Sequence, residues 1–176
     1  MIKSSSASIA ERLSLLNQQN SHQFKNEMAN VCTSRRWQNL LEQARPFRSK
    51  AHFIDSAQQA FAQLAESDWL EAFAGHPMIG DLASLQQKYS HGKHLSQAEQ
   101  AQVGDAQRQT LQALLQLNQQ YLARYGFIFI VCASGKSAET MLALLQQRFG
   151  RSREQELLTA AEQQQQISHI RMENLF

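Results

Sequence analysis

With 176 residues, 43% of them hydrophobic, the chain can bury one good core, so we expect one domain over residues 1–176. Lysine and arginine together number 17 and aspartate and glutamate 15, and the formal charge of +2 is too balanced to predict binding to nucleic acid or to a membrane. The two cysteines, Cys32 and Cys132, supply neither a disulfide framework nor a set of metal ligands, which favours reduced thiols.

Apolar residues repeat at helical spacing along most of the chain. Ser8 and Glu11 have the spacing of a capping box at the first helix. Gly75 is expected to end the fifth helix in a left-handed conformation. The glutamine run 163–166, in the last helix, is interpreted as a solvated face. In chain order, the predicted helices span residues 8–17, 24–31, 37–44, 50–65, 69–73, 81–88, 96–102, 106–124, 138–149 and 154–172.

Residues 127–132, with the sequence FIFIVC, break the helical pattern because they are continuously apolar and all but the last are aromatic or β-branched. No partner strand for them is evident. Their backbone N–H and C=O groups therefore need other partners, and a ligand could supply these. The predicted fold class is all-α: a single-domain helical bundle with one buried extended segment near residues 127–132.

His76 lies in the segment Gly75-His76-Pro77-Met78-Ile79-Gly80, in which proline fixes the backbone beside a titratable imidazole. A histidine held in this way can donate or accept a proton near neutral pH. The segment taken alone is more typical of a turn whose histidine bonds a neighbouring carbonyl. Both interpretations stay open at this point.

Ser96 and Glu99 stand three residues apart, where the helix over residues 96–102 is predicted to start. A capping box has this spacing, and its two side chains only satisfy free backbone amides. The spacing alone favours the cap over a catalytic role.

His91 and His94 suggest a metal site, but Gly92 between them weakens a helix, and no acidic or cysteine cluster stands nearby in the sequence. A basic loop is the simpler interpretation. Arg171 lies near the end of the last predicted helix, where the helix dipole favours a cation. Its planar guanidinium could also bind a carboxylate or a ureido oxygen.

Several motifs follow one another in an order that is more specific than any one of them. They are Trp37 with Arg45-Pro46-Phe47, His76-Pro77-Met78-Ile79-Gly80, Ser96-x-x-Glu99-Gln100, Asn118-x-x-Tyr121, Tyr125-Gly126-Phe127-Ile128-Phe129 and Ile170-Arg171. As a set, these motifs resemble the 2-oxo-4-hydroxy-4-carboxy-5-ureidoimidazoline (OHCU) decarboxylases, and the resemblance covers most of the chain.

The resemblance implies an all-α, commonly dimeric carboxy-lyase of uric acid and purine degradation, which forms (S)-allantoin without a metal or an organic cofactor. It also implies that His76 is the catalytic acid and base, that Glu99 works beside it, and that Arg171 binds the anionic substrate. The residues that it implies as the lining of the pocket are Pro77, Ser96, Gln100, Ile128, Phe129, Ile130, Val131 and Cys132.

Two other functions are compatible with parts of the sequence. A non-catalytic helical interaction module would explain the helices and their caps, but not the order of the motifs. Metal-assisted hydrolysis would use His76, His91, His94 and Glu99.

The compartment and the partners follow from what the sequence lacks. Residues 1–6 are not followed by the apolar run of a signal peptide, and no stretch approaches the roughly 18 apolar residues of a membrane span. We therefore expect a cytoplasmic protein that binds neither nucleic acid nor a membrane. A small-molecule substrate and a second copy of the chain, as partners, are what the resemblance implies.

Overall fold

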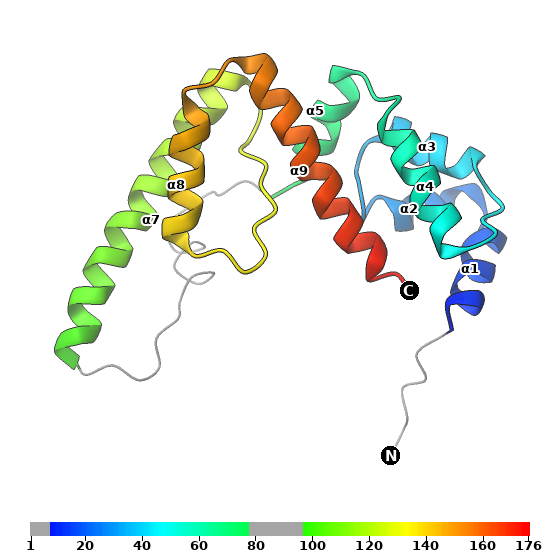
Figure 1. Cartoon of the computed structure of the whole chain (residues 1–176), viewed down its shortest axis with the longest axis horizontal. Helices are drawn as coiled ribbons and strands as arrows, with labels where there is room; N and C mark the ends of the chain where they lie inside the picture. The colour runs from blue at the N-terminus through cyan, green and yellow to red at the C-terminus, as the bar shows by residue number, and fades with distance from the viewer. Residues whose placement is uncertain (1–7, 78–96) are drawn as a thin grey trace. The chain divides into compact units, whose positions relative to one another are not determined.

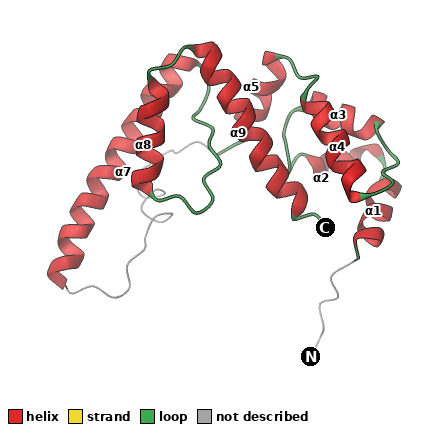
Figure 2. Cartoon of the chain, viewed as in Figure 1, coloured by secondary structure: helices red, strands yellow, loops and turns green. Residues whose placement is uncertain are grey.

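The computed structural model describes residues 8–77 and 97–176, with the backbone alone for residues 97–106. Within these ranges all regular secondary structure is helical, which confirms the predicted all-α class (Figure 2). The helices are α1 (Ile9–Gln18), α2 (Ser21–Met28), α3 (Arg35–Gln43), α4 (Lys50–Phe61), α5 (Glu66–Ala74), α7 (Gln97–Tyr125), α8 (Ala138–Phe149) and α9 (Arg153–Glu173).

The helices divide between two compact units, of which the first joins Met1–His76 to Ala161–Phe176. In this unit α3 packs against α2, α4 and α5. Trp37 of α3 is fully buried, stacks on Phe61 with ring centroids 5.1 Å apart, and donates its Nε1–H to the Ala57 carbonyl at 3.1 Å. Met172, near the end of α9, is buried in the same core.

The second unit is Pro77–Ala160, in which α7 and α8 lie side by side (Figure 1). Buried apolar residues follow helical spacing along both helices, as expected for two helices that pack together. They are Leu111, Leu114 and Tyr121 on α7 and Met141 and Leu145 on α8. The division into two compact units does not test whether the whole chain is one domain, and that stays a prediction.

The connection between α7 and α8 contains the segment that the sequence predicts to be extended. Figure 2 shows it as a loop, without a strand. Phe127, Phe129 and Ile130 are buried, whereas Ile128 and Val131 are only partly covered. Gly126 and Gly135 bracket the segment with φ angles of 79° and 70°, in the left-handed region where glycine is favoured.

The observed helix ends differ from the predicted ones mainly where a cap was not recognised. Helix α2 starts three residues early because Asn20 and Gln23 form a capping box, with bonds of 2.9 and 3.2 Å. Helix α5 starts at Glu66 rather than at Trp69 because the Asp68 carboxylate accepts the backbone N–H of Ala65 at 2.9 Å. The predicted capping box of Ser8 and Glu11 is confirmed.

Two predicted helices, over residues 96–102 and 106–124, are one helix, α7. The prediction of a break was wrong because Gly104 lowers helix propensity without removing a backbone hydrogen bond, unlike proline. The helix predicted over residues 81–88 lies outside the described residues. None of the described helices combines the length and the apolar character needed to cross a bilayer.

Gly75 ends α5, but not in the predicted conformation: its φ is −75° and its ψ −8°, so the expectation of a left-handed stop was wrong. The reason for a glycine is spatial. A Cβ atom at this position would overlap the side chain of Thr33, whose hydroxyl lies 3.1 and 3.2 Å from the carbonyls of Glu71 and Ala72. The close approach of Thr33 to the end of α5 requires the glycine.

Candidate active site

His76 follows directly on the last turn of α5, in the first unit. Its backbone N–H donates to the Phe73 carbonyl at 3.1 Å, and that of Gly75 donates to Ala72 at 3.3 Å. These bonds continue the helical turn and set the direction in which the imidazole leaves the backbone. The His76 side chain is partly buried, and Pro77 after it is exposed.

The His76 ring is hydrogen-bonded to a buried side chain of α9. Its Nε2 lies 2.5 Å from Oε1 of Gln164, a residue with no exposed surface. Gln164 Nε2 donates to the hydroxyl of Ser168 at 3.0 Å, and Ser168 donates to the Val31 carbonyl at 3.2 Å. Ser168 is also fully buried. Two side chains therefore connect the imidazole to the backbone carbonyl of Val31, shortly after the end of α2.

The same carbonyl holds Arg171, which lies in the last turn of α9. Arg171 Nη1 donates to the Val31 carbonyl at 3.1 Å, and the residue is partly buried. The guanidinium has five N–H donors, so this bond leaves donors for a ligand. The structure thus places His76 and Arg171 in one unit with a common anchor at Val31.

Burial lowers the pKa of His76 below its usual value of 6.5, because desolvation disfavours the charged imidazolium. The hydrogen bond to Gln164 raises the pKa, and the nearby positive charge of Arg171 lowers it further. His76 is therefore a neutral imidazole at neutral pH, the form that can accept a proton.

The loop between α7 and α8, in the second unit, contains Ile128–Cys132, whose backbone is predicted to contact the substrate. Two of its carbonyls accept hydrogen bonds from cations of the chain: Ile130 from Arg148 Nη1 and Cys132 from Lys136 Nζ, both at 2.7 Å. The position of the loop backbone is therefore set by these side chains as well as by its buried aromatic residues.

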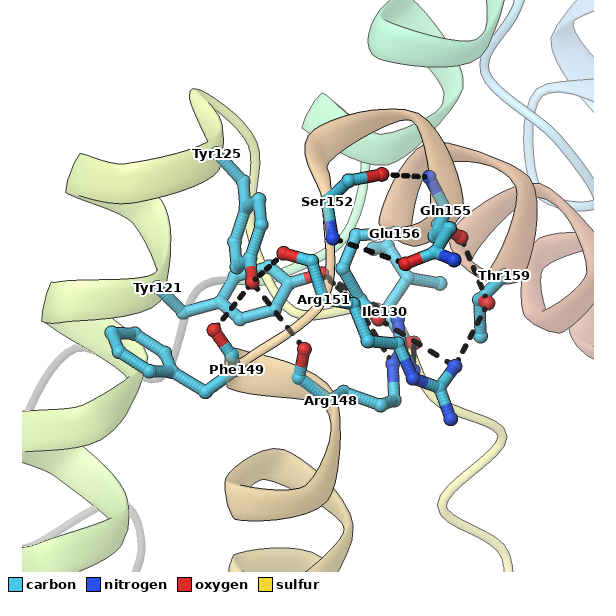
Figure 3. Close-up of polar contacts among 10 residues, drawn as sticks. All are labelled: Tyr121, Tyr125, Ile130, Arg148, Phe149, Arg151, Ser152, Gln155, Glu156 and Thr159. Atoms are coloured by element: carbon cyan, nitrogen blue, oxygen red, sulfur yellow. Dashed lines mark hydrogen bonds and ion pairs between the residues drawn. The ribbon is translucent and has the colours of Figure 1, made fainter.

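Arg148 belongs to a buried polar cluster that joins α7, α8 and α9 (Figure 3). Its Nε lies 2.9 Å from Glu156 Oε2, which also accepts the hydroxyl of Tyr121 at 2.6 Å. The guanidinium stacks over the Phe129 ring, 4.6 Å from its centroid. Burial and the bond to Glu156 raise the pKa of Tyr121, so this phenol stays protonated and donates.

Tyr125, one turn after Tyr121, closes the end of α8 in the same cluster. Its hydroxyl lies 2.6 Å from the Phe149 carbonyl and 3.0 Å from that of Arg151 (Figure 3). The last carbonyls of a helix have no partner within the helix, so a buried hydroxyl among them stabilises this end. Both tyrosines of the sequence motifs thus support the loop and its neighbouring helices.

The predicted site residues are distributed over both units, and one of them lies outside the described residues. His76 and Arg171 lie together in the first unit, and the loop 128–132 lies in the second. Glu99 and Gln100 are in the first turn of α7, where Glu99 is the third residue, the position from which a capping box reaches back. Ser96 lies outside the described residues. A shared substrate site for this whole set stays a prediction.

Sequence reasoning missed the residues that hold the imidazole. The interpretation of residues 163–166 as a solvated face was wrong for Gln164, which is fully buried. Apart from Ala161, the buried positions of α9 repeat every four residues, along one helical face, so helical periodicity is the signal that could have placed Gln164 in the core. These positions are Glu156, Ala160, Gln164, Ser168 and Met172.

No group of three or more histidine, cysteine, aspartate or glutamate side chains in metal-binding geometry occurs within the described residues. His91 and His94, the residues of the metal hypothesis, lie outside them. Of the two cysteines, Cys32 is buried, and desolvation raises the pKa of its thiol to about 11. This thiol therefore stays protonated.

Comparisons with known proteins agree with the helical fold and with the family that the motifs resemble. The crystal structure of an OHCU decarboxylase in the presence of (S)-allantoin superimposes with a TM-score of 0.68 at 31% identity, covering 86% of this chain and 97% of that one. The crystal structure of an (S)-allantoin synthase shares the fold at 19% identity, with a TM-score of 0.66 over 93% of this chain and 54% of that one.

Sequence relatives point to the same class of helical decarboxylases. The 2-oxo-4-hydroxy-4-carboxy-5-ureidoimidazoline decarboxylase of Halalkalicoccus jeotgali is 30% identical over 91% of this chain and 89% of its own length. The uric acid degradation bifunctional protein TTL of Arabidopsis thaliana is 31% identical over 82% of this chain, which spans only 45% of that protein.

The family model described as OHCU decarboxylase matches residues 17–173. The chain belongs to the OHCU decarboxylase family, as its motifs predict. Membership of this family of uric acid degradation supports the enzymatic interpretation over the interaction module.

Proposed function

We propose that this chain decarboxylates OHCU to (S)-allantoin, without a metal or an organic cofactor. The observation that carries the proposal is a neutral, partly buried imidazole fixed in the same unit as a guanidinium with donors to spare. This pair offers a base for one proton and a charged fork for one carboxylate. Family membership supports the choice of substrate.

The substrate can supply its own electron sink. Its carboxylate and hydroxyl share one ring carbon, next to a carbon in a C=N bond. When CO₂ leaves, the electron pair of the broken C–C bond forms a C=C bond, and the C=N pair moves onto nitrogen, which takes up a proton. No separate electron-accepting cofactor is needed for this step.

His76 is proposed to complete the reaction by moving one proton. The imidazole removes the hydroxyl proton, so that the oxygen becomes a carbonyl oxygen, while the C=C pair takes a proton at the carbon that carries the ureido group. The proton that this carbon takes is the one that the imidazolium gained from the hydroxyl, and its delivery restores the neutral imidazole. Delivery to one face of the ring would give a single hand of allantoin.

The other predicted residues have roles in binding and orientation. Arg171 would hold the substrate's carboxylate until CO₂ leaves, by a bidentate contact. Glu99 would bond the imidazole or the substrate hydroxyl. The residues proposed to line the pocket are Pro77, Ser96, Gln100 and Ile128–Cys132.

Replacing His76 by asparagine tests the proposal. Asparagine can still donate a hydrogen bond, but it cannot take up a proton at neutral pH. We expect kcat/KM for OHCU decay to fall by about 10²–10⁴, the usual contribution of a general acid–base group. The decay is followed by loss of ultraviolet absorbance.

His22→Asn is the matched control, because His22 is exposed on α2 and bonded only to Asn26 among the described residues. It should keep the wild-type rate. A folded His76→Asn protein with near wild-type turnover would remove His76 from the mechanism.

The assembly and the compartment are also proposals. A homodimer in the cytoplasm is what the family resemblance and the sequence suggest. Light scattering on a size-exclusion column measures the mass in solution, and a value of one chain, 20.0 kDa, would contradict the dimer.

A further inference from the structure

We propose that Gln164 and Ser168 are positioning residues that keep the proton of the neutral His76 ring on Nε2, so that Nδ1 is the atom that exchanges a proton with the substrate. The assignment of Nε2 rests on the first unit alone. The role of Nδ1 toward the substrate rests on the proposed function.

The series of hydrogen bonds ends at a backbone carbonyl, and because a carbonyl can only accept, this end sets the direction of the other bonds. The Val31 carbonyl can only accept, so the Ser168 hydroxyl, 3.2 Å away, donates its one proton there. The Ser168 oxygen is then left to accept, and the group 3.0 Å from it must be the NH₂ of Gln164. This orients the amide.

An amide oriented in this way presents its oxygen to His76. Gln164 Oε1 can only accept, and it lies 2.5 Å from Nε2 of the ring. Nε2 must therefore carry a proton, and in the neutral ring Nδ1 carries the lone pair. The reverse tautomer would place a lone pair of Nε2 against a lone pair of Oε1.

Burial disfavours the other orientation of the Gln164 amide. Gln164 and Ser168 have no exposed surface, so water cannot replace a bond that a rotated amide would lose. At an exposed site the same amide could turn over at little cost. Here one rotation would leave the NH₂ of Gln164 facing Nε2 and its oxygen facing the oxygen of Ser168.

The arrangement serves both charge states of the ring. When Nδ1 takes up a proton, Nε2 still donates to Gln164, and no partner has to move. The Val31 carbonyl also accepts from Arg171 Nη1 at 3.1 Å, so the base and the guanidinium are held by one backbone atom. The charged group that acts on the ring in this unit is Arg171, and Cys32 beside it is a protonated thiol.

Magnetic resonance of the full chain with ¹⁵N-labelled histidine tests the proton's position without substrate. Long-range ¹H–¹⁵N correlations are recorded at pH 8, with the His76 signals identified by their loss in His76→Asn. We expect a protected ring proton on Nε2 in the wild type, with Nδ1 of the unprotonated type. A proton on Nδ1 overturns the proposal.

Gln164→Met, which keeps the length of the side chain but removes the acceptor, should abolish the protection of that proton. We expect kcat to fall by about tenfold or more with little change in KM, as for the loss of one hydrogen bond to a charged group. Wild-type protection together with wild-type kcat in this variant contradicts the proposal.

Ser168→Ala frees the amide to turn over and provides a variant with minimal change in volume. It should broaden or shift the Nε2 proton signal and lower kcat, and a wild-type spectrum would contradict the proposed chain of donors. Gln166→Met, on the exposed face of α9, is the control and should leave the Nε2 proton signal and kcat unchanged. Wild-type protein with the expected spectrum but no activity on OHCU would refute the proposed substrate and leave the tautomer assignment intact.

Discussion

His76 combines two demands that are usually in conflict, because it is covered enough to stay neutral and open enough to keep one nitrogen for chemistry. Burial lowers its pKa, and Arg171 adds to the effect, while Gln164 limits it. A general base gains from a pKa near or below the working pH, because the unprotonated form is then populated.

The pH dependence of catalysis follows from this direction. We expect kcat/KM to be flat above the usual histidine value of 6.5 and to fall only as the pH drops through the lower pKa of His76. Arg171→Lys keeps the positive charge, and so the acid limb should stay below pH 6.5. A limb centred above pH 6.5 in the wild type would contradict the lowered pKa.

The same shift contributes to stability with a definite sign. The folded protein binds fewer protons than the unfolded chain between the folded pKa and about 6.5. The contribution of the neutral His76 to the free energy of unfolding is therefore complete above pH 6.5. It is lost as the pH falls through the pKa that His76 has in the folded protein. Unfolding of wild-type and His76→Asn proteins by urea across this range measures the difference.

At this scale the sequence predicted candidate residues of the site, but not the side chains that hold them. The motif around His76 and the position of Arg171 identify residues that the structure places in one unit. Gln164 was missed because side chains in a glutamine run are typical of solvent-exposed positions, and Ser168 because nothing local marks a single serine as buried. Their burial depends on Val31, more than 100 positions away in the chain, and local pattern contains no such information.

Helix ends show how one residue type serves two purposes. Gly75 and Gly150 both cap helices with right-handed backbone angles, φ −75° and −87°. Added Cβ atoms would meet the Thr33 side chain at Gly75 and nothing within 4 Å at Gly150. Only the first glycine is required by its surroundings.

Alanine substitutions at these two positions should therefore have opposite effects. Gly75→Ala should lower the free energy of unfolding by about 1–3 kcal/mol through overpacking. Gly150→Ala should raise it by about 0.4–1 kcal/mol by restricting the unfolded chain. Denaturant melts measure both, and Thr33→Ala should recover part of the Gly75→Ala loss.

The loop between α7 and α8 depends on the buried cluster around Arg148. Arg148→Met removes the shorter ion pair of the buried Glu156, at 2.9 Å, and leaves it only the pair with Arg151 at 3.7 Å; it also leaves the Ile130 carbonyl without its donor. We expect a loss of about 3–5 kcal/mol in the free energy of unfolding, the usual cost of breaking a buried ion pair.

The control for this variant is an exposed pair in the first unit. Arg35 is 85% exposed and pairs with Glu71 at 2.6 Å. Arg35→Met should cost less than about 1 kcal/mol, because water screens such pairs. Equal losses for Arg148→Met and Arg35→Met would contradict a structural role for the buried cluster.

Element positions were predicted well wherever pattern and caps agree. The bounds of α8 coincide with the predicted 138–149, because Ser137 caps one end and Gly150 the other. The segment 127–132 was recognised as exceptional but is a loop. Its apolar residues are matched to Tyr121 and Arg148 rather than to a second strand, and these partners depend on tertiary packing.

At the scale of the whole molecule, α9 supplies buried residues to both compact units. Glu156 belongs to the second unit, and Gln164, Ser168 and Met172 to the first. A single helix thus carries both the partners of the imidazole and the carboxylate that pairs with Arg148. Substitutions along α9 should therefore have effects that depend on the unit to which each residue belongs.

Met172→Ala removes a side chain that is 1% exposed in the core of the first unit. It should lower the free energy of unfolding by about 2–5 kcal/mol. Relative to the wild type, amide hydrogen exchange in this variant should be accelerated more in α1–α4 than in α7 and α8. Leu158→Ala, at a residue that is 66% exposed on the same helix, should stay within about 0.5 kcal/mol of the wild type.

The handedness of the product tests the enzyme most directly. OHCU is generated from urate enzymatically, and optical rotation is followed with and without this chain. We expect decay faster than the spontaneous reaction, with a growing rotation of the sign of (S)-allantoin, and neither effect with His76→Asn. Decay at the spontaneous rate to a racemic product with the wild-type chain would contradict decarboxylation by this protein.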